Sequence, residues 1–390
     1  MGTPKTGRRQ GAALVGSLAE WVELTKRPTV LLGDIARHVF QEAKNQKRRR
    51  DVIHPSELAR DDWCPRREYY QISDVRAGKP VPQRSFSFQQ HTIFAEGHEV
   101  HSKWQGWLAD MGILAGCWRC LSCELKTSEV TVGPPKMCPR CGQSVWDYAE
   151  VPLSDAEHLI SGHADGYIAD IETLIEIKTI GLGTLRMDVP DLLAQYTIAG
   201  PDGREVPDLY AIWKELNTPL LPHVRQANIY MWLARRNNLP VRQMVFLYEF
   251  KATQAAKEFV ITPDESVLTP LLEKAKAVVD ALDGRAPIPQ RAHEPTSNVC
   301  EECPYFSACY GVDRQRIGQS SSGRGAETGS ARATATGETA GRDTGPSSAH
   351  IGAVRRSPDG SVPGNTRLVR VRRRPSSNSR DSGPGSRDSR

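Results

Sequence analysis

Two carboxylates and a lysine stand close together in the stretch GHADGYIADIETLIEIKTIG, residues 162–181: Asp165, Glu176 and Lys178. The flanking residues have β character, and a turn centred on Asp170 and Ile171 predicts a hairpin in which Asp165 lies opposite Glu176. Opposed residues have Cβ atoms about 4.5–5.5 Å apart. Two carboxylates at that separation repel unless a positive charge lies between them, and a divalent cation with oxygen ligands is the natural occupant.

The lysine shares a strand face with the second carboxylate. Side chains alternate along a strand, so Leu174, Glu176 and Lys178 point to one side. Such a lysine can orient or deprotonate a water, or stabilise charge on a phosphate. The alternative is an ordinary hairpin with an exposed Glu–Lys ion pair, since Glu-x-Lys is a common pattern. The opposing Asp165 favours the metal site.

These residues resemble the core motif of the PD-(D/E)XK nuclease superfamily. Asp165 and Glu176-Ile177-Lys178 match its D…(D/E)-x-K pattern. The resemblance implies a core of mixed central sheet flanked by helices. It also implies Mg²⁺ or Mn²⁺ held by Asp165, Glu176 and the backbone carbonyl of Ile177, with Lys178 assisting the attack of water on a phosphodiester.

Two further motifs resemble the RecB-like branch of that superfamily. The stretch GHEVH, residues 97–101, is similar to the G-x-x-x-H of its first helix, and the resemblance makes His101 a metal ligand. Gln226 and Tyr230, in QANIYMWL, match its Q-x-x-x-Y motif. Residues four apart lie on one face of a helix, so both side chains can reach the same site. Either motif alone is weak evidence for the RecB-like branch, and the resemblance rests on the order of both motifs around the D…E-x-K stretch.

Nine cysteines fall into groups that suggest metal binding, because thiols in a reducing compartment are more often ligands than disulfides. Cys64, Cys300, Cys303 and Cys309 resemble the layout of the helicase-associated AddB and CRISPR-associated "Cas-four" nuclease families, with one cysteine before the nuclease core and three after it. That resemblance implies a [4Fe–4S] cluster that closes the domain. A Cys₄ zinc site and buried unligated thiols are the alternatives.

The central group has zinc-ribbon spacing: Cys120-x₂-Cys123, then fourteen residues, then Cys138-x₂-Cys141. Cys117-x₂-Cys120 has the same spacing, so Cys117 competes for the first pair, and we prefer Cys120 with Cys123. The predicted insert, residues 115–147, is either a structural knob or a contact surface for DNA or protein. The basic side chains that favour contact are Lys126, Lys136 and Arg140.

The fold class predicted for these motifs is α+β (α/β), with an N-terminal helical segment over residues 1–50, a nuclease domain over 51–312 and a disordered basic tail over 313–390. Hydrophobic periodicity places helices and strands around the motifs. Predicted helices cover 12–46, 91–111, 185–198, 206–216, 221–237 and 264–283, and a short capped helix begins near Ser56. Predicted strands cover 149–153, 159–169, 173–180, 244–250 and 257–261.

Charge and hydropathy indicate a basic tail on a slightly acidic chain, with neither a membrane span nor a secretory signal. The net charge is +5, yet residues 313–390 hold 15 Arg against 7 acidic residues, so the remaining chain is slightly acidic. The tail is too poor in apolar residues to fold, and it is either a solvated segment or an arm for nucleic acid. No apolar run is long enough for a membrane span, and no secretory signal is recognisable, which predicts a cytoplasmic protein of a bacterium or a phage-infected cell.

The function expected is a metal-dependent deoxyribonuclease, an exonuclease or end-processing enzyme in DNA recombination, repair or replication. Its expected substrate is single-stranded DNA or DNA ends. A P-loop motif is missing from the sequence, so a helicase would have to be a separate partner. A structure-specific endonuclease is one alternative. The other is a non-catalytic zinc-ribbon DNA-binding protein, which would have no need of Asp165, Glu176 and Lys178.

Overall fold

The computed structural model describes residues 30–45, 48–82 and 85–311. The predicted tail, 313–390, and most of the predicted N-terminal helical segment lie outside these residues. Within them, no helix is both long and apolar enough to cross a membrane.

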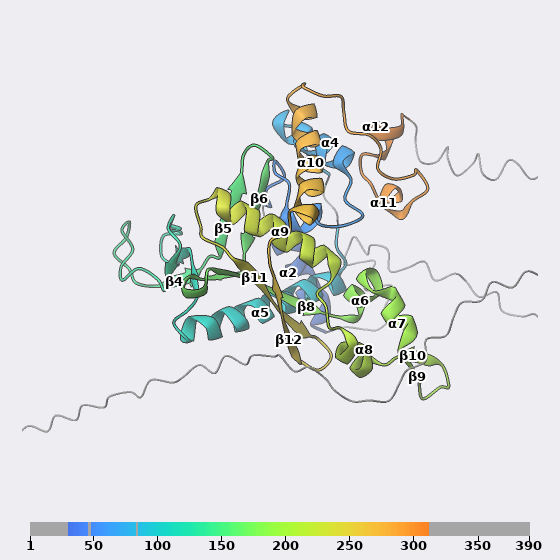
Figure 1. Cartoon of the computed structure of the whole chain (residues 1–390), viewed down its shortest axis with the longest axis horizontal. Coiled ribbons are helices and arrows are strands. Elements are labelled where there is room, and N and C mark those ends of the chain that lie inside the picture. Colours follow the sequence, from blue (N-terminus) through green and yellow to red (C-terminus); the bar gives the residue numbers. More distant parts are fainter. Residues whose placement is uncertain (1–29, 46–47, 83–84, 312–390) are drawn as a thin grey trace, which may run out of the picture. The chain divides into compact units, whose positions relative to one another are not determined.

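A six-stranded mixed sheet forms the centre of the fold, as predicted for the α+β class (Figure 1). Its strand order is β12-β11-β8-β7-β1-β3. The strands β8 and β11 are parallel, and the other neighbours are antiparallel. The helices between β8 and β11 supply the long crossover that a parallel pair requires. The bounds are β1 Ala115–Gly116, β3 Thr131–Val132, β7 Gly166–Ile168, β8 Thr173–Ile180, β11 Gln243–Phe250 and β12 Ala256–Ile261.

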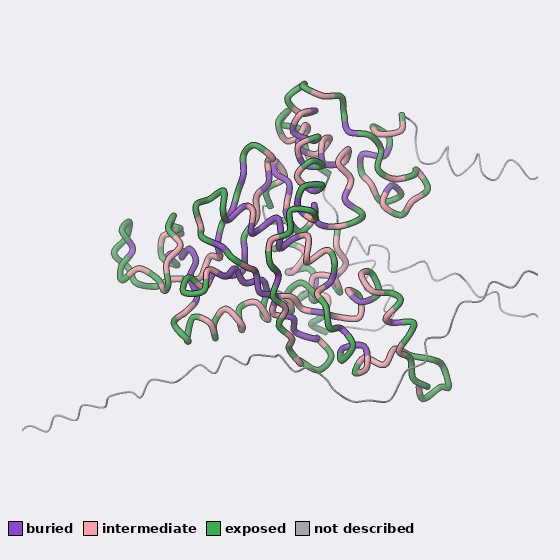
Figure 2. The backbone as a smooth tube through the Cα atoms, viewed as in Figure 1, coloured by how far each residue is buried: buried purple, intermediate pink, exposed green. Residues whose placement is uncertain are grey.

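One helix covers each side of the strand that carries the predicted motif. Leu174 belongs to the main core with the residues of α9, Leu221–Arg236. Ile175 and Ile177 instead pack against α5, Phe88–Asp110. The predicted alternation of β8 is therefore confirmed, and Glu176 lies on the α9 side. Buried residues gather along these central strands (Figure 2).

The predicted strand 159–169 is wrong as a single strand. It divides at Asp165 into β6, Ile160–Ala164, and β7. The strand β6 pairs with β5, Val151–Asp155, in a separate two-stranded sheet. Because the β7–β8 pairing ends at Gly166 and Ile175, β7 forms no further strand pairs with the part of β8 after Ile175.

The predicted helix 185–198 is divided by Pro190 into α6, Leu182–Asp188, and α7, Pro190–Gln195. Proline removes a helical hydrogen bond and clashes with the preceding turn, which accounts for the division. A small hairpin follows where the prediction continued as helix: β9, Thr197–Ala199, and β10, Glu205–Pro207.

One substantial helix was not predicted: α4, Pro65–Arg76, which packs against α10, Glu265–Leu282 (Figure 1). Its sequence, PRREYYQISDVR, is mostly polar and buries only Glu68 and Ile72, so it has little apolar periodicity to detect. The remaining elements are α2 Leu32–Asn45, α3 Pro55–Leu58, α8 Leu209–Glu215, α11 Asn298–Glu301, α12 Phe306–Tyr310, β2 Trp118–Cys120 and β4 Trp146–Tyr148.

Candidate active site

The hairpin of β7 and β8 has the predicted register. Gly166 pairs with Ile175 and Tyr167 with Leu174, so Asp165 comes level with Glu176 just beyond the last pair. The connection is a 3₁₀ turn, Ala169–Ile171, followed by Glu172 in the left-handed conformation. A turn of local residues thus sets the separation of the two carboxylates.

Asp165 is held at the point where β7 stops. Its Oδ2 accepts a hydrogen bond of 2.6 Å from the backbone N–H of Ile177, on the part of β8 that β7 no longer covers. Its Oδ1 lies 3.2 Å from Nδ1 of His101 on α5. Asp165 is only 5 % exposed, so its carboxylate is largely shielded from water.

Glu176 has one satisfied and one unsatisfied oxygen. Its Oε1 accepts from Lys178 Nζ at 2.7 Å and from Gln226 Nε2 at 2.8 Å. Its Oε2 is buried and has no hydrogen-bond partner among the residues that the structure describes. Burial, and then the neighbouring Asp165, raise the pKa of Glu176 to about 7. An unpartnered buried carboxylate oxygen is costly, and a cation beside it would remove that cost.

His101 is carried by a well-defined helix. A capping box between Ser87 and Gln90 fixes the start of α5. Burial lowers the pKa of His101, but the hydrogen bond and charge of Asp165 outweigh it, and the net pKa lies above the usual value. The imidazole nitrogen faces a carboxylate at contact distance, as a metal ligand beside its partner ligand would.

Glu150 also belongs to this group, although no motif in the sequence points to it. Ligand atoms of His101, Glu150 and Asp165 all lie within 4.8 Å of one another. Burial, and then Asp165, raise the pKa of Glu150 to about 7. Glu150 belongs to no motif, and only the folded chain brings it to the site.

Gln226 and Tyr230 lie on the same buried stretch of α9, as their spacing predicts. Gln226 contacts Glu176 directly, whereas Tyr230 faces Gly162 on β6. A Cβ on Gly162 would lie 2.8 Å from the Tyr230 hydroxyl oxygen and 2.9 Å from Cδ of Pro55. Burial, and then Glu176, raise the pKa of Tyr230 well above its usual value, so it remains a neutral phenol.

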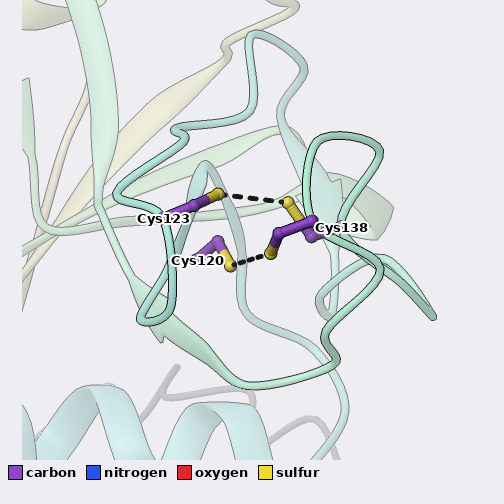
Figure 3. A group of neighbouring side chains, drawn as sticks. Cys120, Cys123 and Cys138 are labelled. Carbon is purple, nitrogen blue, oxygen red and sulfur yellow. Dashed lines mark hydrogen bonds between the residues drawn. The ribbon is translucent and has the colours of Figure 1, made fainter.

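The central cysteines converge on one point (Figure 3). Sγ atoms of Cys120 and Cys141 lie 3.5 Å apart, and those of Cys123 and Cys138 lie 3.6 Å apart. Zn–S bonds of about 2.3 Å in a tetrahedron place neighbouring sulfurs about 3.8 Å apart. The two measured distances are close to that value, and all four sulfurs lie within 4.8 Å of one another, near enough to bind a single metal ion.

The two Cys-x₂-Cys turns have the same backbone geometry. The N–H of Glu124 donates to the Cys120 carbonyl at 2.9 Å, and that of Gly142 donates to the Cys138 carbonyl at 2.9 Å. Both donors are left-handed, with φ of 58° and 72°. Cys117 stands apart and its Sγ donates to the Glu129 carbonyl at 3.6 Å. Cys120 therefore begins the first turn, and Cys117 lies outside the group.

The outer cysteines surround a small cavity. Cys64, Cys300, Cys303 and Cys309 all line it, from the start of α4 and from α11 and α12. Among the described residues, no three of their sulfurs fall within 4.8 Å of one another, in contrast to the central set. A four-iron cluster separates its thiolates more widely than a single zinc ion does, because the irons lie between them.

Contacts between distant segments hold this cavity together. The Tyr70 hydroxyl donates to the Ala308 carbonyl at 3.2 Å, and the Tyr70 ring stacks on Tyr305. Arg66 donates to the Pro289 carbonyl at 3.2 Å. The start of the described domain is thus fastened to its end at the outer cysteines.

No family model matches the chain, and no curated protein matches it. Among solved structures, the crystal structure of SSO0001 has 15 % sequence identity and a TM-score of 0.32, covering 72 % of this chain and 97 % of that one. The alkaline exonuclease from Laribacter hongkongensis has 12 % identity and a TM-score of 0.32, covering 60 % of this chain and 89 % of that one. The solved structures similar to this chain therefore include an exonuclease, at an identity and a TM-score too low to bear on activity.

Proposed function

We propose that this chain is a divalent-metal-dependent deoxyribonuclease, acting as an exonuclease or end-processing enzyme. The observation that carries the proposal is the unpartnered, buried Oε2 of Glu176 beside Asp165 and His101. A buried cluster of two carboxylates and an imidazole is stable when a cation compensates its charge. Lys178, on the same strand face, adds a cationic group suited to a phosphate or a water.

The residues present fit Mg²⁺ or Mn²⁺. Asp165, Glu176 and His101 would hold the ion, with the Ile177 carbonyl as the fourth ligand that the family pattern implies. When bound, such an ion supplies a Lewis acid and a water of lowered pKa. Lys178 would orient that water or stabilise the phosphate, and Gln226 keeps the Glu176 carboxylate in place through its 2.8 Å hydrogen bond.

Two groups of four cysteines would each bind a metal centre. Zinc would be held by Cys120, Cys123, Cys138 and Cys141, whose sulfur atoms all lie within 4.8 Å of one another. A [4Fe–4S] cluster would be held by Cys64, Cys300, Cys303 and Cys309, which line one cavity. Neither group takes part in the hydrolytic chemistry.

End-labelled single- and double-stranded DNA, incubated with the protein and Mg²⁺ or Mn²⁺, tests the proposal. We expect metal-dependent cleavage that Asp165→Asn abolishes. Asp170→Asn is the matched control, because Asp170 lies exposed in the same hairpin. Shortening from one labelled end indicates an exonuclease, and internal fragments on a circular substrate indicate an endonuclease. Cleavage that persists in Asp165→Asn, or its absence with either metal in the wild type, overturns the proposal.

A further inference from the structure

The cysteine-rich insert is built into the central sheet rather than attached to it. Its first strand, β1, pairs with β7 at Ala115 and Tyr167, two residues from Asp165. Its strand β3 extends the same sheet beyond β1. The sheet therefore joins the zinc ribbon directly to the strand that positions the catalytic carboxylate.

In the structure the insert extends past its predicted end at residue 147 and closes on itself at Glu150. The Cys117 N–H donates to the Glu150 carbonyl at 2.8 Å, and the Ala149 N–H donates to the Cys117 carbonyl at 2.9 Å. The Tyr148 hydroxyl donates to the Ala115 carbonyl at 3.0 Å, and its ring occupies the space that a Cβ on Gly116 would need. This base is tightly packed, so the position of residue 150 is fixed by the fold of the ribbon.

The backbone of Glu150 adopts the left-handed conformation, with φ of 60°, which residues other than glycine rarely take. Such backbone strain persists only where the surrounding structure imposes it, and it concentrates at functional sites. Here the strained residue directs its carboxylate to within 4.8 Å of the ligand atoms of His101 and Asp165. A second observation points to a cation beside Asp165: the buried Oε2 of Glu176 has no hydrogen-bond partner in the part of the chain that the structure describes.

A cavity opens at this point between the insert and the nuclease core. It is lined by Glu150 and by the polar or cationic side chains of Gln105, Arg119, Lys126 and His163. Gln105 donates to the Asp165 carbonyl at 3.0 Å, which ties the cavity wall to the catalytic strand. Arg119 is paired with Asp147 at 2.6 Å, which leaves Lys126 as the cation better placed for a phosphate.

We propose that Glu150 is an additional ligand of the nuclease metal, supplied by the insert, and that the zinc-stabilised fold of the insert sets the affinity of that metal. The proposal rests on the nuclease function and extends it. It gives the insert a role beyond a structural knob or a contact surface, since zinc at one site would support a second metal at another.

The role of Glu150 as a metal ligand is tested by isothermal titration calorimetry, in which Mn²⁺ alone is added to the full-length, zinc-loaded protein. Glu150→Gln should weaken Mn²⁺ binding at least about tenfold, the lower end of the loss usual when a group around a metal is removed. Glu129→Gln makes the same charge change at an exposed position of the insert and should bind as the wild type does. His101→Ala identifies the site by weakening the same binding event.

The outcomes separate this proposal from the nuclease function. Equal Mn²⁺ affinity in the wild type and Glu150→Gln overturns the role of Glu150 and leaves the nuclease site standing. Failure of the wild type to bind Mn²⁺ overturns both. Circular dichroism of each variant shows whether a loss of binding comes from the site or from unfolding.

A double substitution tests the coupling to zinc. Cys141→Ser removes one zinc ligand and should weaken Mn²⁺ binding in the wild-type background. In the Glu150→Gln background it should have no further effect, because the ligand that the insert supplies is already gone. Additive losses, or no loss from Cys141→Ser alone, overturn the coupling.

Discussion

At the scale of single residues, the pairing of Asp165 with Glu176 follows from local sequence, whereas the environment of the two carboxylates does not. Asp165 and Glu176 are brought level by a short turn, so counting residues from that turn is enough to pair them. Glu150 depends on the closure of an insert of more than thirty residues, and no local pattern encodes that closure. The buried, unpartnered oxygen of Glu176 likewise arises only when α9 and α5 cover β8.

Lys178 is expected to act on the reaction rather than on metal binding. Lys178→Met should lower the cleavage rate by about 100-fold or more, the scale usual for a positioned proton-transfer or charge-stabilising group, while Mn²⁺ still binds. Cleavage and calorimetric Mn²⁺ binding are measured on the same preparation. Lys274→Met, at an exposed position of α10, is the control and should match the wild type in both. Wild-type cleavage by Lys178→Met would exclude this role.

At the scale of elements, strands and helices with strong periodicity were predicted well, and β8 has its predicted bounds. The sequence analysis missed α4, which is mostly polar and lacks periodicity. It also missed the division of the 159–169 strand at Asp165, whose carboxylate accepts a hydrogen bond from the Ile177 N–H. Tertiary contacts decide such features, so a single sequence does not reveal them.

The packing of β6 against α9 and α3 depends on Gly162. Gly162→Ala should destabilise the fold by about 1–3 kcal/mol, the usual cost of overpacking, because its Cβ would meet Tyr230 and Pro55. The urea midpoint of unfolding measures the change. In the control Gly106→Ala, the new Cβ has nothing within 4 Å and lies in α5, so that variant should be as stable as the wild type or more so. Equal midpoints for both variants would contradict the packing described.

The two equivalent cysteine turns predict about one zinc ion per chain in the insert. Elemental analysis should find zinc in the wild type and in Cys117→Ser, since Cys117 lies outside the sulfur group. Cys123→Ser should lose it, because three thiolates bind zinc more weakly than four. Zinc retained by Cys123→Ser but lost by Cys117→Ser would assign the first pair to Cys117 and Cys120.

At the scale of the whole molecule, the outer cysteines join segments from the start and end of the described domain. The sequence suggested this closure through a family resemblance alone. The structure adds the stacking of Tyr70 on Tyr305 and the hydrogen bond from Arg66 to Pro289, which no spacing rule contains.

Protein purified without oxygen should be brown if these thiolates bind iron, whereas a zinc site is colourless. Cys64→Ala should lose the colour and unfold at a lower temperature, because the ligand set joins distant segments. Cys117→Ala should keep both the colour and the melting temperature. A colourless anaerobic preparation with two zinc ions per chain would replace the cluster with a second zinc site.

The most direct test of the account is Glu176→Gln, which keeps the shape of the side chain and removes the charge that a metal would compensate. We expect metal-dependent DNA cleavage to fall at least about 100-fold, with Mn²⁺ binding weakened and the circular dichroism spectrum unchanged. Glu258→Gln, at an exposed position of β12, should cleave as the wild type does. Wild-type cleavage and Mn²⁺ affinity in Glu176→Gln would contradict the claim that this buried carboxylate holds the metal of a nuclease.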